Sequence, residues 1–262
     1  MSLDIDLEEM RQILQRWREK RLPKEHSVNL LSPRFTMLDM QLHTIKELVH
    51  RHQKDEVATQ IKFDKLDAEI EIWSENEQLK VLRQELFFEA VFMNSAHSMA
   101  AVGMLAPFIE SLYVAIFQSL GDMIVLPTNH PRLNLEASKV WNPKYYYSLS
   151  SKGEKCDLLK GIGQLSDASE LAHFLPRHTQ TTLEALFRYR NNMFHNGFEW
   201  PDAKIASFAD DSIKWHTGWF ELVERNEKPW LFYMTPEFCT HCVDLIDKII
   251  YNTGRYLRTR SS

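Results

Sequence analysis

Glycine and proline are scarce in this chain: its 262 residues include only 8 glycines and 10 prolines. Because these two residues mark most tight turns, their scarcity indicates few turns and long uninterrupted elements. Hydrophobic residues make up 44% of the chain and charged residues 26%, which is typical of a globular protein and excludes a disordered one. The composition therefore predicts a mainly α fold.

Cysteine is scarcer still, and basic charge is not in excess. Three cysteines cannot form a closed set of disulfides, which excludes a disulfide-stapled secreted module. The first ten residues are too acidic for a secretory leader, so we expect a cytoplasmic protein. A formal net charge of −5 excludes the broad basic surface of a general nucleic-acid coat, but it is compatible with a local basic cleft.

Long hydrophobic runs are also few, and the most apolar one covers residues 99–126. Pro107, Glu110, Gln118 and Asp122 interrupt it within the length of a single membrane span. We therefore expect a buried core helix and no membrane partner. A membrane-associated sensor that uses this run is the weakest of the functional alternatives.

Helical periodicity predicts two parts of unequal size. An N-terminal part, residues 1–35, comprises an amphipathic helix over residues 4–21 and a linker with two prolines over residues 22–33. The rest of the chain, residues 36–262, is predicted to form a helical bundle.

Within the bundle, residues 36–92 show an almost unbroken helical pattern. A break near Asp55 or near residues 75–77 would turn this stretch into a helical hairpin. A further helix interrupted by two glycines is expected over residues 158–175. The last one is expected from residue 236 to about residue 256, with Thr235 as its N-cap.

Strand signals occur in one place. Residues 213–224 and 229–234 are rich in aromatic and β-branched residues, and residues 225–228 between them read as a turn. This pattern predicts a small β-hairpin insertion near residues 213–234. By contrast, residues 127–151 read as a turn-rich loop that packs against the bundle.

Two of the three cysteines, Cys239 and Cys242, flank His241 in the last predicted helix. One such pair without a second cannot complete a four-ligand zinc site. We therefore interpret them as buried thiols, and we expect neither a metal nor a cofactor.

The most informative stretch is Arg190-Asn191-Asn192-Met193-Phe194-His195-Asn196-Gly197. The predicted helix around it runs from about Thr182 to His195, with a capping box of Thr181 and Glu184 and with Gly197 as the residue after its end. Helical spacing places Arg190 in an apolar stripe, which has these other members: Leu183, Leu186, Phe187, Met193 and Phe194.

A second set of polar side chains shares a neighbouring face of this helix. Arg188, Asn191, Asn192 and His195 lie three, four or seven residues apart, so donors and a titratable imidazole converge there. This combination of residue types indicates phosphate chemistry on RNA. A purely structural interpretation stays open: the arginine forms an ion pair, and the histidine caps helix carbonyls.

Arg190-Asn191 followed by His195 resembles the Arg-x(4 to 6)-His motif of the HEPN superfamily (higher eukaryotes and prokaryotes nucleotide-binding domain), in which Asn often follows the Arg. The resemblance covers the helical part from about residue 85 to the C-terminus. Many members are metal-independent ribonucleases of toxin and defence systems, and others are inert scaffolds that bind nucleotides or RNA. The fold of the superfamily is a helical bundle that dimerises across the motif helix.

The resemblance implies the motif roles for Arg190 and His195 and a supporting polar role for Asn191. Arg188 also satisfies the motif, with six residues between it and His195, so the identity of the working arginine stays open. We expect Arg188, Asn192 and Asn196 to contribute to substrate binding.

Cleavage of RNA by its own 2′-hydroxyl needs a base, an acid and a cation for the phosphorane, but no metal when those three are present. His195 is the expected acid or base, Arg190 the phosphate ligand and Asn191 the orienting group. One imidazole cannot be acid and base in the same step, so a homodimer is expected to supply the second. The strongest alternative is a non-catalytic dimeric scaffold, or a nucleotide- or RNA-binding regulator, and an antitoxin or regulatory protein is a possible partner.

Overall fold

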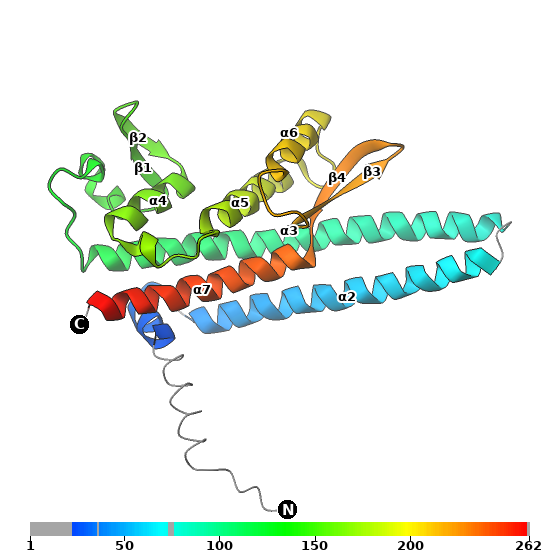
Figure 1. The fold of residues 1–262 in the computed structure, drawn as a ribbon, viewed down its shortest axis with the longest axis horizontal. Coiled ribbons are helices and arrows are strands. Elements are labelled where there is room, and N and C mark those ends of the chain that lie inside the picture. The colour runs from blue at the N-terminus through cyan, green and yellow to red at the C-terminus, as the bar shows by residue number, and fades with distance from the viewer. Residues whose placement is uncertain (1–22, 36, 73–75, 261–262) are drawn as a thin grey trace, which may run out of the picture. The chain divides into compact units, whose positions relative to one another are not determined.

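The computed structural model describes residues 23–35, 37–72 and 76–260, and these residues fold mainly into α-helices (Figure 1). The predicted fold class, mainly α with a small β-hairpin, is confirmed. The helix predicted over residues 4–21 lies outside the described residues. The helices are α2 (Leu38–Ile72), α3 (Glu77–Gly121), α4 (Leu158–Ala168), α5 (Thr179–Asn196), α6 (Asp202–Ser212) and α7 (Pro236–Arg260), and the strands are β1 (Tyr145–Ser148), β2 (Gly153–Cys156), β3 (Phe220–Arg225) and β4 (Lys228–Met234).

The chain forms two compact units, and two of its helices contribute to both. Among the described residues, the first unit contains those from 23 to 38, Ile109–Thr179 and those from 245 to 260. The second unit contains Asp39–Phe108 and Gln180–Asp244. The boundary between them falls inside α3 and inside α7, so each of these helices supplies packing surface to two separate cores.

Residues 23–31 of the first unit are helical, whereas the sequence predicts a linker over residues 22–33. Leu31 and Ser27 are fully buried in this segment. The Ser27 hydroxyl donates a hydrogen bond to the carbonyl oxygen of Ile250 on α7. Packing against another helix therefore orders a segment that proline content alone marks as irregular.

A buried arginine organises the loop that precedes β1. The Arg132 side chain is fully buried and donates hydrogen bonds to the carbonyl oxygens of Val140 and Tyr145, both at 2.7 Å, and of Asn142 at 2.9 Å and Lys139 at 3.1 Å. Burial lowers the pKa of Arg132 to about 10, so the guanidinium is still charged at neutral pH. Carbonyl dipoles replace the water that the charge loses.

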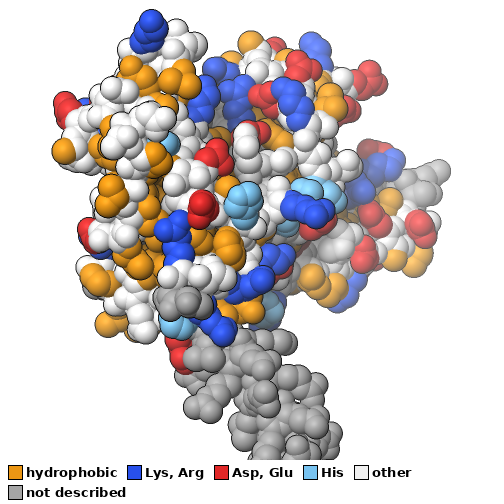
Figure 2. Space-filling model, turned by 60° about the vertical axis from the view of Figure 1, so that its left-hand side comes forward, with side chains coloured by type: hydrophobic (Ala, Val, Ile, Leu, Met, Phe, Trp, Pro, Cys, Tyr) orange, Lys and Arg blue, Asp and Glu red, His pale blue; other side chains and the backbone are white. Residues whose placement is uncertain are grey.

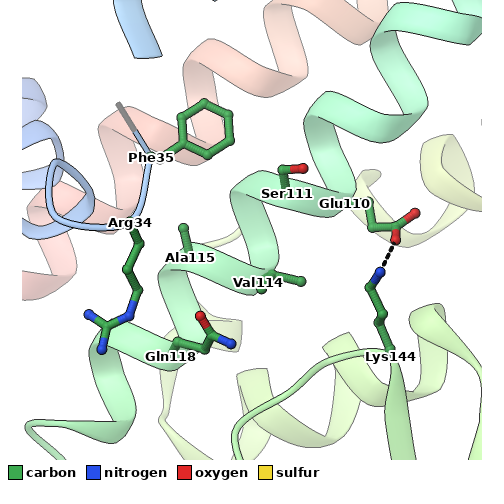
Figure 3. Close-up of a pocket in the computed structure, with 8 residues that line it drawn as sticks. All are labelled: Arg34, Phe35, Glu110, Ser111, Val114, Ala115, Gln118 and Lys144. Carbon is green, nitrogen blue, oxygen red and sulfur yellow. Dashed lines mark ion pairs between the residues drawn. The ribbon is translucent and has the colours of Figure 1, made fainter. Parts of the chain in front are cut away.

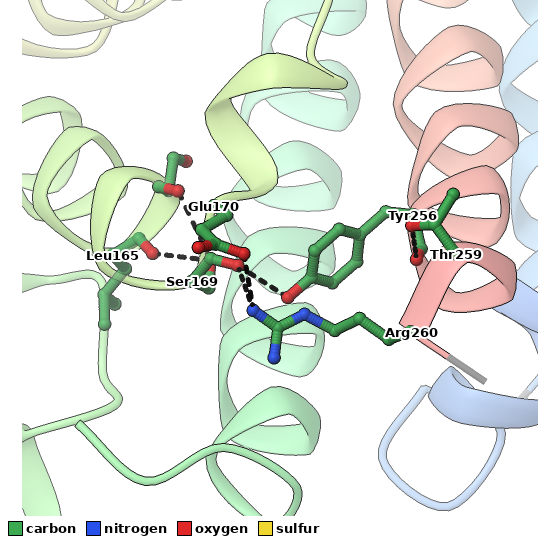
Figure 4. A network of polar contacts seen from close by, with 7 residues as sticks. Leu165, Ser169, Glu170, Tyr256, Thr259 and Arg260 are labelled. Carbon is green, nitrogen blue, oxygen red and sulfur yellow. Dashed lines mark hydrogen bonds and ion pairs between the residues drawn. The ribbon is translucent and has the colours of Figure 1, made fainter. Parts of the chain in front are cut away.

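A second polar network joins the end of α7 to the turn after α4 (Figure 4). The Tyr256 hydroxyl donates to the Ser169 carbonyl oxygen at 2.6 Å, and the Arg260 guanidinium donates to the same oxygen at 3.3 Å. Arg260 also pairs with the Glu170 carboxylate at 3.0 Å. Ser169 in turn donates its hydroxyl to the Leu165 carbonyl oxygen at 2.7 Å. The C-terminal turn of α7 is thereby held against α4 within the first unit.

In the second unit, α2 and the first part of α3 form the predicted helical hairpin. The break predicted near residues 75–77 is confirmed, since α2 ends at Ile72 and α3 begins at Glu77, whereas the break predicted near Asp55 is wrong. The Asn76 side chain caps α3 by accepting hydrogen bonds from two backbone N–H groups of its first turn. The helix α2 continues through Asp55 without a break. The part of α2 beyond Asp55 packs on α3.

The predicted β-hairpin is confirmed as β3 and β4, which are shorter than the predicted range of 213–234. Asn226 and Glu227 form its turn, and both have positive φ, as a two-residue type I′ turn requires. A second hairpin, β1 with β2, lies in a region that the sequence predicts as loop. Its strands have four residues each and little burial, so they carry almost no alternation signal.

The last helix begins as predicted. The Thr235 hydroxyl accepts a hydrogen bond from the Phe238 backbone N–H at 3.2 Å, and Pro236 occupies the first helical position of α7. The helix continues past the predicted end at residue 256 to Arg260. Leu257, which is buried, continues the apolar packing of α7 beyond residue 256.

Among the described residues, α3 is the one helix that is long and apolar enough to cross a membrane. Its most apolar 18-residue window is 61% buried within the protein, as expected for a core helix, which passes the same test of length and composition. Leu105, Leu112 and Ile116 on it are completely buried. The helix α3 continues through Pro107 without a break. The cytoplasmic location of the protein stays a prediction.

We expect two glycines of α4 to respond oppositely to alanine. A Cβ at Gly161 would clash with the backbone carbonyls of Pro143 and Tyr145, whereas a Cβ at Gly163 meets nothing within 4 Å. Gly161→Ala should lower the free energy of unfolding by about 1–3 kcal/mol through overpacking. Gly163→Ala should raise it by about 0.5–1 kcal/mol through helix propensity. Urea unfolding followed by circular dichroism measures both, and equal shifts of the same sign would contradict this account of α4.

Candidate functional site

The predicted motif lies in the second half of α5, within the second unit. The helix begins at Thr179, a turn before the predicted start at Thr182. The predicted capping box is therefore wrong, since Thr181 lies inside the helix. Glu184 accepts a hydrogen bond from the Gln180 side chain, at 2.9 Å, and so pairs with the preceding turn instead of capping it.

The end of α5 is as predicted. Gly197 has φ of +74° and its N–H donates to the carbonyl oxygen of Met193 at 2.9 Å, which is the left-handed termination that glycine favours. The Trp200 indole N–H donates to the Gly197 carbonyl oxygen at 2.9 Å and holds the outgoing chain. His195 consequently occupies the final turn of a helix whose end is well defined.

One side of α5 is completely buried. Leu186, Tyr189 and Met193 have no exposed surface, and the Tyr189 hydroxyl donates to the Phe232 carbonyl oxygen of β4 at 3.2 Å. The apolar stripe predicted from the sequence does not include Tyr189. It includes Phe194, whose side chain is 57% exposed, so that part of the prediction is wrong.

Asn191 and His195 lie on the opposite, solvent-exposed side of α5, one helical turn apart. Arg190 lies between the two sides and is half-buried. Three of the predicted site residues thus reach, fully or partly, the surface of a single rigid helix. An amide, an imidazole and a guanidinium at this spacing provide hydrogen-bond donors, a proton carrier and a cation.

The Arg188 side chain contacts α6. Its guanidinium donates to the Ser207 hydroxyl at 2.9 Å, and its Nε lies 3.0 Å from a carboxylate oxygen of Asp211. The sequence analysis missed both partners because it did not predict α6. Pro201 followed by Asp202 at the start of that helix is a signal that would have found it.

Asn192 and Asn196 are less accessible than predicted for substrate ligands. Asn192 is 5% exposed, and its side-chain nitrogen is buried with no hydrogen-bond partner among the described residues. The Asn196 amide donates to the Asn192 carbonyl oxygen at 2.8 Å, across the last turn of α5. Asn196 therefore stabilises the helix end, and the buried Asn192 lies on the side of α5 that faces the core.

Acidic and basic side chains are mixed on the face drawn in Figure 2, and the described residues there form no continuous basic surface. This agrees with the net charge of −5. A nucleic acid on this face would therefore contact few cations, and its binding there would be weak at physiological salt.

The cysteines of α7 are buried thiols, as predicted. Burial raises the pKa of Cys239 to about 12 and that of Cys242 well above its ordinary value, so both are protonated at neutral pH. His241 forms a hydrogen bond with the Thr182 hydroxyl at 2.9 Å. Within the described ranges, no group of three or more His, Cys, Asp or Glu side chains is arranged to hold a metal ion.

A cavity of about 250 Å³ lies in the first unit, along one side of α3 (Figure 3). Arg34 and Lys144 are its cations, and each already has a carboxylate partner at 2.6 Å: Asp122 for Arg34 and Glu110 for Lys144. Because both cations are paired with carboxylates, this cavity has no uncompensated positive charge that would bind an anion. A larger cavity, in the second unit, is lined by two carboxylates that have no cationic partner among the described residues.

Comparison with known proteins finds no matching family model, no similar curated protein and no similar solved structure.

We expect the Asp211 contact to stabilise the second unit at neutral pH. Lys214 and Arg188 lower the pKa of Asp211 below its ordinary value, so its contribution is present at neutral pH and disappears as the pH falls through the lowered pKa. Asp211→Asn should cost about 0.5–1 kcal/mol at pH 7, a decrease of about 2 °C in Tm.

The matched control is Asp210→Asn, a neighbouring exposed aspartate on the same helix. Calorimetric scans at pH 7 and below about pH 3 compare the variants, since aspartate is protonated in the acidic range. A deficit for Asp211→Asn that persists unchanged in acid, or an equal deficit for the control, contradicts an electrostatic role.

Proposed function

We propose that this protein is a metal-independent endoribonuclease of the HEPN type, in which Arg190, Asn191 and His195 form the reactive set. The observation that carries the proposal is the exposure of Asn191 and His195 on one side of α5, one turn apart, next to the half-buried Arg190. Buried side chains in these positions would have favoured the structural interpretation, in which the same residues serve ion pairing and capping.

Contacts with α6 give Arg188 a structural role. Arg188 pairs with Asp211 and Ser207, so a phosphate would have to compete with a carboxylate already in place. A guanidinium binds two phosphate oxygens through parallel N–H groups, which suits the non-bridging oxygens of the scissile phosphodiester. We assign phosphate binding to Arg190 because it stands directly before Asn191 in the motif, on the same helix as His195.

The proposed reaction is transphosphorylation. The 2′-hydroxyl gives its proton to a base and attacks the adjacent phosphorus, while the departing 5′-oxygen takes a proton from an acid, which leaves a 2′,3′-cyclic phosphate. A neutral imidazole serves as the base and an imidazolium as the acid. Arg190 stabilises the negative charge of the phosphorane, and the Asn191 amide orients the phosphate.

One copy of His195 cannot perform both proton transfers in the same step. A two-fold dimer in which the α5 surfaces face each other would place a second His195 in the same cleft, because an isologous interface repeats one patch on both subunits. The exposed ring of Phe194 between the polar residues gives that surface an apolar component.

We expect purified protein to cleave total RNA in the presence of EDTA and to leave cyclic phosphate ends. His195→Ala and Arg190→Ala should each reduce the cleavage rate at least about 100-fold, because each removes a proton carrier or the cation of the transition state. Gel analysis of the RNA and chemical identification of the 3′ ends measure the outcome.

His50→Ala is the control, since His50 is an exposed histidine of the same unit on α2, away from α5. It should retain full activity, and all variants should keep the circular dichroism spectrum of the wild type. Cleavage by the His195→Ala variant at the wild-type rate would contradict the assignment of His195 as the proton carrier. An inactive wild-type protein that still binds RNA would support the non-catalytic regulator instead.

The shared cleft is tested with heterodimers of one wild-type chain and one His195→Ala chain, purified through two different tags. If one step needs both imidazoles, cleavage per heterodimer should fall about 100-fold, close to the level of the variant homodimer. Cleavage per heterodimer equal to that of the wild-type dimer is incompatible with a composite site.

A further inference from the structure

The second unit contains a cavity of about 330 Å³ that is separate from the exposed side of α5. Side chains of α2, α3 and the β3–β4 hairpin line it. Phe63, Phe87 and Val91 provide an apolar wall, with Ala90 beside them. Its volume is at the lower end of the range of small-molecule sites, so it matches a small ligand with an apolar body.

Two carboxylates meet at one end of this cavity. Glu56 of α2 is half-buried, and Glu221 of β3 lies at the open rim. Neither carboxylate forms an ion pair with a described lysine, arginine or histidine within 4 Å. The other charged residues of the lining, Asp67 and Arg83, neutralise each other by an ion pair. The cavity therefore carries an uncompensated negative charge at this one end.

The carboxylate of Glu221 is held in place by the β-hairpin. Glu221 and Tyr233 are directly opposite each other in the ladder of β3 and β4. Tyr233 is only 7% exposed, and the Glu221 carboxylate and the Asn94 side chain of α3 are near enough to its hydroxyl to shift the pKa of that hydroxyl. The strand pairing thus places Glu221 beside a buried tyrosine on a rigid hairpin, and both side chains line the cavity.

This arrangement makes the ionised form of Glu56 unfavourable in the folded protein. Burial, and after it the charge of Glu221, raise the pKa of Glu56 above the usual glutamate value. A carboxyl with a raised pKa destabilises the folded protein once it ionises, at pH values above its unfolded pKa. A positive group between the two carboxylates would remove this penalty, whereas no described side chain does so.

We propose that this cavity binds a small organic cation, with a primary ammonium group between Glu56 and Glu221 and an apolar or aromatic body against Phe63 and Phe87. The ammonium donates three hydrogen bonds, which matches two carboxylates that each have free acceptor positions. The aromatic rings pack against the hydrocarbon part of the ligand, and the volume of about 330 Å³ suits a small molecule.

The probe is 2-phenylethylamine, and 2-phenylethanol is its uncharged counterpart of nearly the same shape. We expect the amine to bind the full-length wild-type protein, by isothermal titration calorimetry, at least about tenfold more tightly than the alcohol, because charged hydrogen bonds favour only the amine. This comparison needs no variant, so it tests the proposal even if a substitution affects folding.

Two variants locate the site. Glu56→Gln and Glu221→Gln should each weaken binding of the amine about tenfold, and neither should affect the alcohol. Glu69→Gln is the matched control, because it removes the same charge from an exposed position of α2 outside the cavity. Glu56→Gln should not lower Tm at pH 7, since it removes a carboxyl whose pKa is raised.

Equal affinities for the amine and the alcohol would overturn the proposal. So would an equal loss of amine affinity in Glu69→Gln, which would indicate a general charge effect. A calcium titration supplies a further outcome: calcium binding that depends on Glu56 and Glu221, without amine binding, would replace the organic cation by a metal ion. None of these results depends on ribonuclease activity.

Discussion

The burial of one side of α5 is the constraint on which the candidate site depends. Tyr189 packs against the rings of Trp200, Phe208 and Phe220, at centroid separations of 5.3–5.9 Å, and donates its hydroxyl to β4. These contacts fix the rotation of α5 about its axis, because turning the helix would expose this aromatic cluster. Once the rotation is fixed, the helical repeat places Asn191 and His195 toward solvent.

Of three buried or half-buried charged groups in this protein, two are compensated and one is not. Arg132 is surrounded by carbonyl oxygens, and Arg188 is paired with Asp211. Glu56 has a second carboxylate for a neighbour instead of a cation. Because burial of an uncompensated charge is expensive, the first two arrangements stabilise structure, and the third marks the cavity that we propose as a ligand site.

Much of the fold follows from local sequence. The long apolar periodicities identify α2, α3 and α7, the predicted break near residues 75–77 separates α2 from α3, Thr235 marks the start of α7, and Gly197 marks the end of α5. These predictions succeed because helix periodicity and capping depend on residues within a few positions of each other. Predictions that relied on glycine and proline as breaks were less successful, because α4 runs through both of its glycines and residues 23–31 are helical.

The sequence by itself determined that this chain is mainly α, that a β-hairpin directly precedes the last helix, and that Arg190, Asn191 and His195 share one helix. Only the tertiary structure decided which of these side chains reach solvent, that Arg188 is paired with Asp211, and that Glu56 meets Glu221 and Tyr233 in a cavity. The physical reason is that helical spacing is set by hydrogen bonds between near neighbours in the chain. Burial and charge pairing depend on residues far apart in sequence, such as positions 56 and 221, which no local pattern brings together.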